Sequence, residues 1–390
     1  MSRQALRPGI DSAARRPIMT SDEQAVATLS QWLALESPTH DAAAINAMQD
    51  MILEEVAGEP IRIERIPGRD GLGDCAVLHA GADNDQPGIL IVTHVDTVHP
   101  VGTLAGPLPV RRDGDRLYGP GVYDMKGGIY LALVAYRNAA RLGAAIGRPI
   151  RFLLSPDEEI GSPTTRALVE DLGHRSSHVL VMEPARPGGA AVTARKGVGW
   201  FDVEVEGRPA HAGSRHQDGR SAIREAARQI LKIEDMTDYG RGTTATVSKV
   251  GGGTAINVVP HQCRFAVDVR ITNTAEGERM ERAILGLEPV GPDIAVKVGG
   301  GINRPAYERS EGVARLFEAA RAEAAALGFE LAEVPMVGGG SDGNFTAALG
   351  IPTLDGLGVD GDGAHTLDEY CLISSIEPRR RLVERLLQTL

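Results

Sequence analysis

Two adjacent carboxylates close an apolar run in the middle of the chain. Glu158 and Glu159 follow Leu153-Leu154-Ser155-Pro156-Asp157 and precede Ile160-Gly161. If the run is a buried strand, the two glutamates point in different directions, so one can bind a metal while the other stays free as a base. A solvated acidic turn would have the same composition. The rest of the chain decides between these interpretations.

Histidines and acids also stand where other predicted strands end. The continuous apolar run at 88–93 delivers His94-Val95-Asp96 to its end. His94 and Asp96 share a side of a strand, so the carboxylate can fix the imidazole tautomer for metal binding. Open α/β sheets bind ligands at this edge. The other candidates there are Asp124 in a glycine-bracketed turn, Glu183 after a strand at 179–182, and His365 in a glycine-rich loop. Taken alone, His365 would be interpreted as a surface histidine and Glu183 as a helix-capping acid.

Helical and strand patterns alternate over most of the chain. Ser21 and Gln24 form a capping box for a first helix, and a helix at 125–142 precedes a strand at 150–154. This alternation predicts an α/β/α catalytic domain with a mostly parallel central sheet.

The pattern changes between residues 196 and 303, where the predicted order is β-α-β-β-α-β. That order is typical of a ferredoxin-like unit, so we expect an inserted α+β lid or dimerisation domain. The catalytic domain would then comprise residues 20–195 and 304–390. Residues 1–19 contain four arginines without periodicity. We interpret them as a disordered leader rather than a weak targeting segment.

Composition excludes several classes of protein. The 390-residue chain has a net charge of -11 and no basic stripe, which argues against a nucleic-acid partner. Its three cysteines are far apart, so neither a disulfide framework nor a thiolate zinc site is indicated. No apolar run approaches the roughly 20 residues of a membrane span, and no secretion signal is recognised, so we expect a soluble cytoplasmic protein with no membrane partner.

These motifs resemble the zinc-dependent amidohydrolase and exopeptidase family that includes glutamate carboxypeptidase, acetylornithine deacetylase, succinyl-diaminopimelate desuccinylase and aminoacylase. The resemblance covers nearly the whole chain after about residue 20. Five motifs carry it, in this order: His94-Val95-Asp96, Gly121-Val122-Tyr123-Asp124-Met125-Lys126-Gly127-Gly128, Asp157-Glu158-Glu159-Ile160-Gly161-Ser162, Met182-Glu183-Pro184 and the late His365.

The resemblance implies a dinuclear zinc site in which Asp124 bridges the ions. Glu159 and His365 would complete one site, and His94 and Glu183 the other. Asp96 would be a catalytic residue that fixes the tautomer of His94, and Glu158 would be the catalytic base. Three carboxylates against two dications leave a net positive centre that can acidify water. Carboxylate-rich sites also accept cobalt or manganese.

The resemblance also assigns roles in and near the inserted domain. His211 would donate a hydrogen bond to the tetrahedral oxyanion, within its own chain or across a homodimer formed through this domain. Asn257 and Arg270 would recognise a substrate carboxylate, and Gly340 belongs to a loop that closes the pocket. An arginine fork suits a carboxylate, although Arg270 could instead be a solvent-side charge on its strand.

We therefore predict a dinuclear zinc hydrolase that cleaves an amide bond to a C-terminal amino acid with a free carboxylate, similar to glutamate carboxypeptidase. The alternative is an N-acyl amino acid deacylase of the acetylornithine deacetylase or succinyl-diaminopimelate desuccinylase type. A remote alternative is a non-catalytic binding homologue. The loss of a ligand or of the base would mark that homologue, but all six positions are filled.

Overall fold

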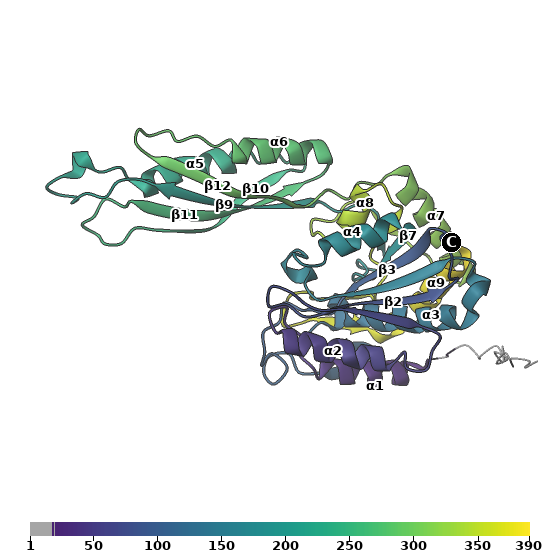
Figure 1. Ribbon diagram of the computed structural model, residues 1–390. Helices are drawn as coiled ribbons and strands as arrows, with labels where there is room; N and C mark the ends of the chain where they lie inside the picture. The colour runs from purple at the N-terminus through teal and green to yellow at the C-terminus, as the bar shows by residue number, and fades with distance from the viewer. Residues whose placement is uncertain (1–17, 19) are drawn as a thin grey trace, which may run out of the picture.

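The computed structural model describes residues 18 and 20–390, so nearly all of the predicted leader lies outside the described residues. A six-stranded sheet forms the centre of the larger part of the molecule (Figure 1). Its order is β1 (Arg62–Ile66), β2 (Cys75–Gly81), β6 (Pro149–Ser155), β3 (Gly88–His94), β7 (Ser176–Val181) and β14 (Thr353–Leu354). Neighbours from β6 to β14 pair in parallel, whereas β1 and β2 are antiparallel. The predicted α/β class with a mostly parallel sheet is confirmed.

Helices cover both faces of this sheet. One core joins it to α1 (Asp22–Leu33), α2 (Ala42–Glu54), α3 (Gly127–Leu142), α7 (Glu311–Ala326) and α9 (Ile373–Thr389). The other core joins it to α4 (Arg166–His174) and α8 (Gly343–Ala348).

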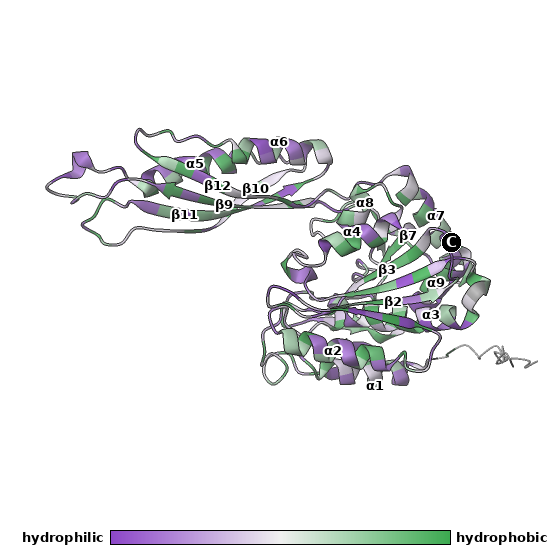
Figure 2. Ribbon diagram, viewed as in Figure 1, coloured by the Kyte–Doolittle hydropathy of each residue, from purple (hydrophilic) through white to green (hydrophobic). Residues whose placement is uncertain are grey.

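Strand β3 supplies both cores, which explains why its sequence is apolar without alternation. Ile89 and Ile91 enter one core, and Leu90 and Val92 enter the other. Figure 2 shows β3 as largely hydrophobic. The capping box of Ser21 and Gln24 at the start of α1 is also confirmed.

A second sheet projects from the first (Figure 1). The segment that forms this sheet also contains two helices. Its elements in chain order are β9 (Gly197–Glu206), α5 (Ala222–Glu234), β10 (Thr244–Gly252), β11 (Gln262–Ile271), α6 (Thr274–Leu285) and β12 (Ala295–Arg304). The antiparallel order β10-β11-β9-β12 is that of a ferredoxin-like fold, as expected. Alternate side chains of β9, such as Phe201 and Val203, pack with the two helices in a core of their own. We call these residues, 197–304, the lid.

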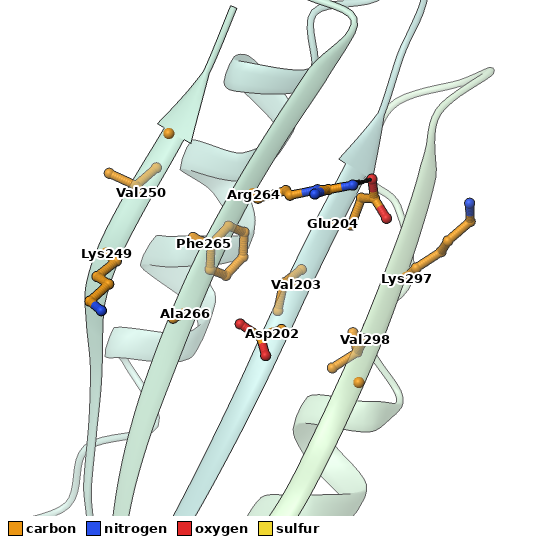
Figure 3. Close-up of a pocket in the computed structure, with 12 residues that line it drawn as sticks. Asp202, Val203, Glu204, Lys249, Val250, Arg264, Phe265, Ala266, Lys297 and Val298 are labelled. Carbon is orange, nitrogen blue, oxygen red and sulfur yellow. Dashed lines mark hydrogen bonds and ion pairs between the residues drawn. The ribbon is translucent and has the colours of Figure 1, made fainter. Parts of the chain in front are cut away.

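The face of the lid sheet opposite its helices is open. Asp202, Glu204, Arg264 and Lys297 stand on this face, and a hollow of about 800 Å³ lies against it (Figure 3). Arg264 and Glu204 form an ion pair across β11 and β9, with 2.6 Å between Nη2 and Oε1. The sheet therefore has one apolar face and one charged face.

Sequence patterning did not reveal a small sheet with the order β15 (Gly361–Asp362), β16 (Tyr370–Leu372), β5 (Arg116–Tyr118), β4 (Arg111–Asp113). It brings the segment around His365 beside the segment that leads to Asp124. Two further short strands, β8 (Ala191–Val192) and β13 (Glu333–Val334), pair in parallel. Within residues 18 and 20–390, no helix has the length and apolar composition of a membrane-spanning segment.

Candidate metal centre

The five side chains expected to bind metal converge at the carboxyl ends of the parallel strands. His94 ends β3, and Glu183 comes two residues after the end of β7. Glu159 lies in a single 3-10 turn that follows β6, and this turn directs the two neighbouring glutamates differently. Asp124 lies in the short turn that leads into α3, and His365 lies between β15 and β16.

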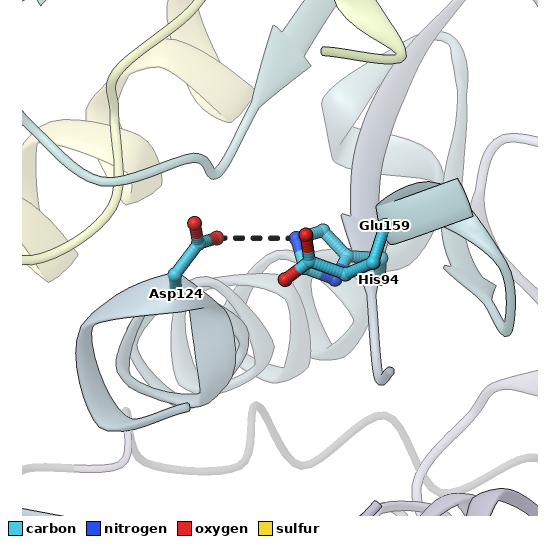
Figure 4. Close-up of side chains that lie close together, drawn as sticks. All are labelled: His94, Asp124 and Glu159. Atoms are coloured by element: carbon cyan, nitrogen blue, oxygen red, sulfur yellow. Dashed lines mark hydrogen bonds and ion pairs between the residues drawn. The ribbon is translucent and has the colours of Figure 1, made fainter. Parts of the chain in front are cut away.

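Asp124 stands between two clusters. Its Oδ1 lies 3.2 Å from His94 Nε2, and its Oδ2 lies 3.4 Å from His365 Nε2. His94 Nε2 also lies 3.5 Å from Glu183 Oε1. His365 Nε2 also lies 3.2 Å from Glu159 Oε2. Figure 4 shows His94 and Asp124 facing each other, with Glu159 beside them. The geometry thus provides two groups of donors that share one carboxylate, which suits a pair of cations.

The pKa values of the three glutamates and of His365 are raised, which indicates that the cluster holds more negative than positive charge. Burial raises the pKa of Glu158 well above its usual value, and it raises the pKa of Glu159 to about 7. Burial and the neighbouring Asp124 also raise the pKa of Glu183. Hydrogen bonds to Asp124 and Glu159 raise the pKa of His365 to about 11. Divalent cations would favour ionised acids and a neutral imidazole.

The donor set therefore fits two divalent cations. Carboxylate oxygens and imidazole nitrogens are ligands for zinc and similar ions. The buried Oε1 of Glu159 has no hydrogen-bond partner among the described residues, so the chain leaves this acceptor for another group. His365 is about half exposed, unlike the other four side chains, which gives the cluster one open side.

Asp96 is a buried acid that contacts both His94 and the turn with the two glutamates. Its backbone carbonyl lies 3.0 Å from His94 Nδ1, and its Oδ1 lies 3.3 Å from the same nitrogen. Both acceptors favour a proton on Nδ1, which leaves Nε2 free as a ligand. The carboxylate of Asp96 also accepts the backbone N–H groups of Glu158 and Glu159, at 3.2 and 3.1 Å. One buried acid therefore orients both a ligand strand and the turn with the two glutamates.

Glu158 lies close to this centre but has a different partner. Its carboxylate comes within 4.8 Å of donor atoms of His94 and Glu183, so distance alone does not separate it from the ligands. Its Oε1 forms an ion pair of 2.8 Å with Arg304 Nη2, and Arg304 is itself buried. This close ion pair distinguishes Glu158 from its neighbour Glu159, whose carboxylate faces His365 instead.

Sequence reasoning missed Arg304. It ends β12, where the lid returns to the main sheet, and its Nη1 lies 2.7 Å from Asp342 Oδ1. A side chain at Gly340 would meet Arg304 Cδ at 2.7 Å, so glycine is required there for close packing. The only signal in the sequence is an arginine directly after the predicted inserted segment.

Arg195 is a second buried cation that sequence reasoning did not assign. It donates to both oxygens of Asp355, at 2.7 and 2.9 Å, and its Nη2 lies 3.9 Å from Glu183 Oε2. The pair packs beneath one of the ligand candidates, where the guanidinium charge offsets that of the acids.

The predicted lid residues lie apart from the metal cluster. Among the described residues, no hydrogen bond or ion pair joins His211, Asn257 or Arg270 to a ligand candidate. The loops of His211 and Asn257 do meet, because Ala212 N–H donates to the Asn257 carbonyl at 2.9 Å. Arg270 donates to both oxygens of Asp268, at 2.7 and 2.9 Å, and its Nη1 lies 3.4 Å from the Gly338 carbonyl.

Comparison with known proteins gives one family match and several relatives. Residues 90–389 match the model described as Peptidase family M20/M25/M40. The chain is 28% identical over 379 residues to carboxypeptidase G2 of Pseudomonas sp. strain RS-16. The aligned region covers 95% of this chain and 90% of carboxypeptidase G2. It is 30% identical over 286 residues to acetylornithine deacetylase of Myxococcus xanthus, covering 70% and 68%.

A solved structure of a dinuclear metal binding peptidase from the M20 family of Bacillus subtilis has the same fold. Its TM-score is 0.64 at 17% sequence identity, and the match covers 93% of this chain and 97% of that one.

Proposed function

The chain belongs to peptidase family M20/M25/M40 and is a hydrolytic metalloenzyme, and on that premise we propose that it releases a C-terminal amino acid from an amide, as a glutamate carboxypeptidase does. The observation that carries this proposal is the pair of donor clusters that share Asp124, with Glu158 beside them and paired to Arg304. Similarity over 95% of the chain to a relative named carboxypeptidase G2 supports the choice of substrate class.

Two zinc ions are the cofactors we propose, with cobalt or manganese as substitutes. His94 and Glu183 would hold one ion, Glu159 and His365 the other, and Asp124 both. The Bacillus subtilis relative described as a dinuclear metal binding peptidase supports the count of two. When bound, such ions act as Lewis acids on a carbonyl oxygen and lower the pKa of water.

Glu158 would move the proton in this reaction. Arg304 Nη2 holds its Oε1, which leaves Oε2 to accept a proton from the attacking water. The same carboxyl group then protonates the departing amine, so one residue acts as base and acid. Arg304 fixes the orientation of Glu158 while Asp96 fixes the backbone of the turn that carries it.

We also propose that two copies pair through the lid. Strand β10 is an edge of the lid sheet, and its Val250 is 64% exposed. Ile223 and Leu231 on the neighbouring α5 are 43% and 67% exposed, and Ile256 is fully exposed. An unpaired strand edge beside exposed apolar side chains is a surface that a second copy can cover.

In that dimer His211 would serve the partner's active site. Its Nδ1 accepts the N–H groups of Gly213 and Ser214, both at 3.1 Å, so the proton resides on Nε2. Nε2 is therefore a donor, which an oxyanion requires. Because His211 is exposed and contacts none of the ligand candidates in its own chain, a second copy is the simplest source of this donor.

Mixed dimers test this arrangement. Neither Glu158→Gln nor His211→Ala should be active alone, but a random mixture of the two chains should recover about a quarter of the wild-type activity, because half of the dimers contain one intact composite site. Steady-state rates before and after exchange of subunits give the answer. A mixture no more active than its parents would place His211 in its own chain's site or outside catalysis.

Arg270→Gln should raise the Michaelis constant for substrates with a free carboxylate by about 10–100-fold, the value of a charge-assisted bidentate bond. Substrates amidated at that carboxylate should change little. Arg264→Gln is the matched control, because Arg264 lies on the same face of β11 and also pairs with an acid. Equal losses on amidated substrates would contradict carboxylate recognition by Arg270.

A substrate panel tests the function itself. Glutamyl conjugates should be hydrolysed in preference to N-acetyl and N-succinyl amino acids. Preferred release of acetate or succinate would instead support the deacylase alternative, which the relative named acetylornithine deacetylase represents. Hydrolysis of no compound in the panel by zinc-loaded protein would contradict both substrate classes.

A further inference from the structure

Glu369 contacts the turn that carries Asp124, but it is neither a proposed metal ligand nor a proposed catalytic residue. Its side chain is 1% exposed and comes four residues after His365. Oε1 accepts the backbone N–H groups of Tyr123 and Asp124, both at 2.9 Å. Oε2 accepts the N–H of Gly121 at 2.9 Å and lies 2.7 Å from His99 Nε2. Four donors therefore surround one buried carboxylate.

These contacts connect three segments that each carry a ligand candidate. The N–H groups belong to the turn of Asp124, the carboxyl group itself belongs to the segment of His365, and His99 lies five residues after His94. His99 is also buried, at 5% exposure. Glu369 thus lies where these three segments meet and contacts the backbone of the Asp124 turn.

The physical reason for a carboxylate at this position is the turn itself. Three N–H groups in one short turn point to the same place, and outside a regular ladder they need acceptors from elsewhere in the chain. A buried carboxylate satisfies several such donors with bonds stronger than those of a neutral acceptor. Since the Asp124 N–H is one of them, the bond fixes the backbone of the very residue that the two donor clusters share.

We propose that Glu369 is a positioning residue for both metal ions. It fixes Asp124 relative to His365 directly and relative to His94 through His99. This inference rests on the proposed dinuclear function. It predicts that Glu369 controls metal affinity and has little effect on substrate affinity, because its four hydrogen-bond donors are three backbone N–H groups and the buried His99, none of which is proposed to contact substrate.

Glu369→Gln tests the proposal with little change in size. The amide oxygen can still accept two N–H groups, but the amide nitrogen faces the Gly121 N–H, which it cannot accept. We expect zinc affinity, measured by competition with a chromophoric chelator, to fall about 10–100-fold, as for other residues that orient metal ligands. With excess zinc, kcat should fall and the Michaelis constant should stay within about twofold of wild type.

Glu225→Gln is the matched control. Glu225 is a buried acid of the lid that accepts the N–H groups of Val290 and Gly291 at 2.8 and 3.0 Å. It should lose comparable stability in urea but keep wild-type zinc affinity. If Glu369→Gln does not fold, His99→Leu removes one of the four donors and should weaken zinc binding by a smaller factor.

Two results would overturn the proposal. One is unchanged zinc affinity in a folded Glu369→Gln protein, or in His99→Leu if only that variant folds. The other is an equal loss of affinity in Glu225→Gln, which would reduce the effect to general destabilisation. Failure of the proposed function is separate, because it would appear in the wild-type protein, either as no zinc binding or as no release of glutamate from the substrate panel.

Discussion

Glu158→Gln is expected to lower kcat by about 10²–10⁴-fold, the usual contribution of general acid–base catalysis. The amide oxygen can still accept from Arg304, so the turn should keep its shape, but the side chain can no longer take a proton from water. Metal content and the Michaelis constant should change little, since the residue is assigned to proton transfer. Rates on a glutamyl conjugate and metal analysis of the same sample measure both effects.

Glu159→Gln is the contrast that makes this result specific. The two residues are neighbours in the same 3-10 turn, and Asp96 accepts the N–H of each. Only Glu159 faces His365, with 3.2 Å between Oε2 and Nε2. Its substitution should lower metal content as well as rate. Loss of metal from Glu158→Gln, or full activity in that variant, would contradict the division of roles between the pair.

Asp124→Asn is expected to weaken the binding of both ions. One of the two oxygens that face His94 and His365 becomes an amide nitrogen, which cannot bind a cation. Lewis-acid stabilisation is worth several kcal/mol, so kcat/KM should fall by on the order of 10³-fold. Metal analysis after gel filtration should give well below one ion per chain, against about two for wild type.

His365→Asn is the companion variant, because His365 belongs to only one of the two clusters. It should lose one ion and retain the other at the site of His94 and Glu183. The pair of variants therefore distinguishes a shared ligand from an ordinary one. An Asp124→Asn protein that kept either ion at wild-type affinity would show that Asp124 does not bridge.

The elements that could be predicted are those that a short contiguous stretch of sequence specifies by its hydrophobic pattern. The continuous apolar run at 88–93 predicts a strand of a mostly parallel sheet, and the structure splits its Ile89 and Leu90 between two cores. The β-α-β-β-α-β order of the lid was readable for the same reason. Strand β2 was missed although its residues also alternate between the two cores, and it makes part of the sheet antiparallel.

The rest of the site depends on contacts that no local pattern encodes. Arg304 meets Glu158 from 146 residues away, and Glu369 meets Asp124 from 245 residues away. Each is a single charged residue whose sequence neighbours look ordinary. The candidate ligands were easier to find, because strand ends concentrate them at one edge of the sheet. The lid residues His211 and Arg270 depend on where the lid lies during catalysis, and their roles remain predictions.

The most direct test of the central claim is anomalous diffraction at the zinc edge from crystals of the zinc-loaded protein. We expect two peaks roughly 3.5 to 4 Å apart, the usual separation in two-metal sites. Asp124 should contact both, with His94 and Glu183 at one and Glu159 and His365 at the other, while Glu158 contacts neither. A single peak, or a peak coordinated by Glu158, would contradict the shared carboxylate and the separate base on which the proposed chemistry depends.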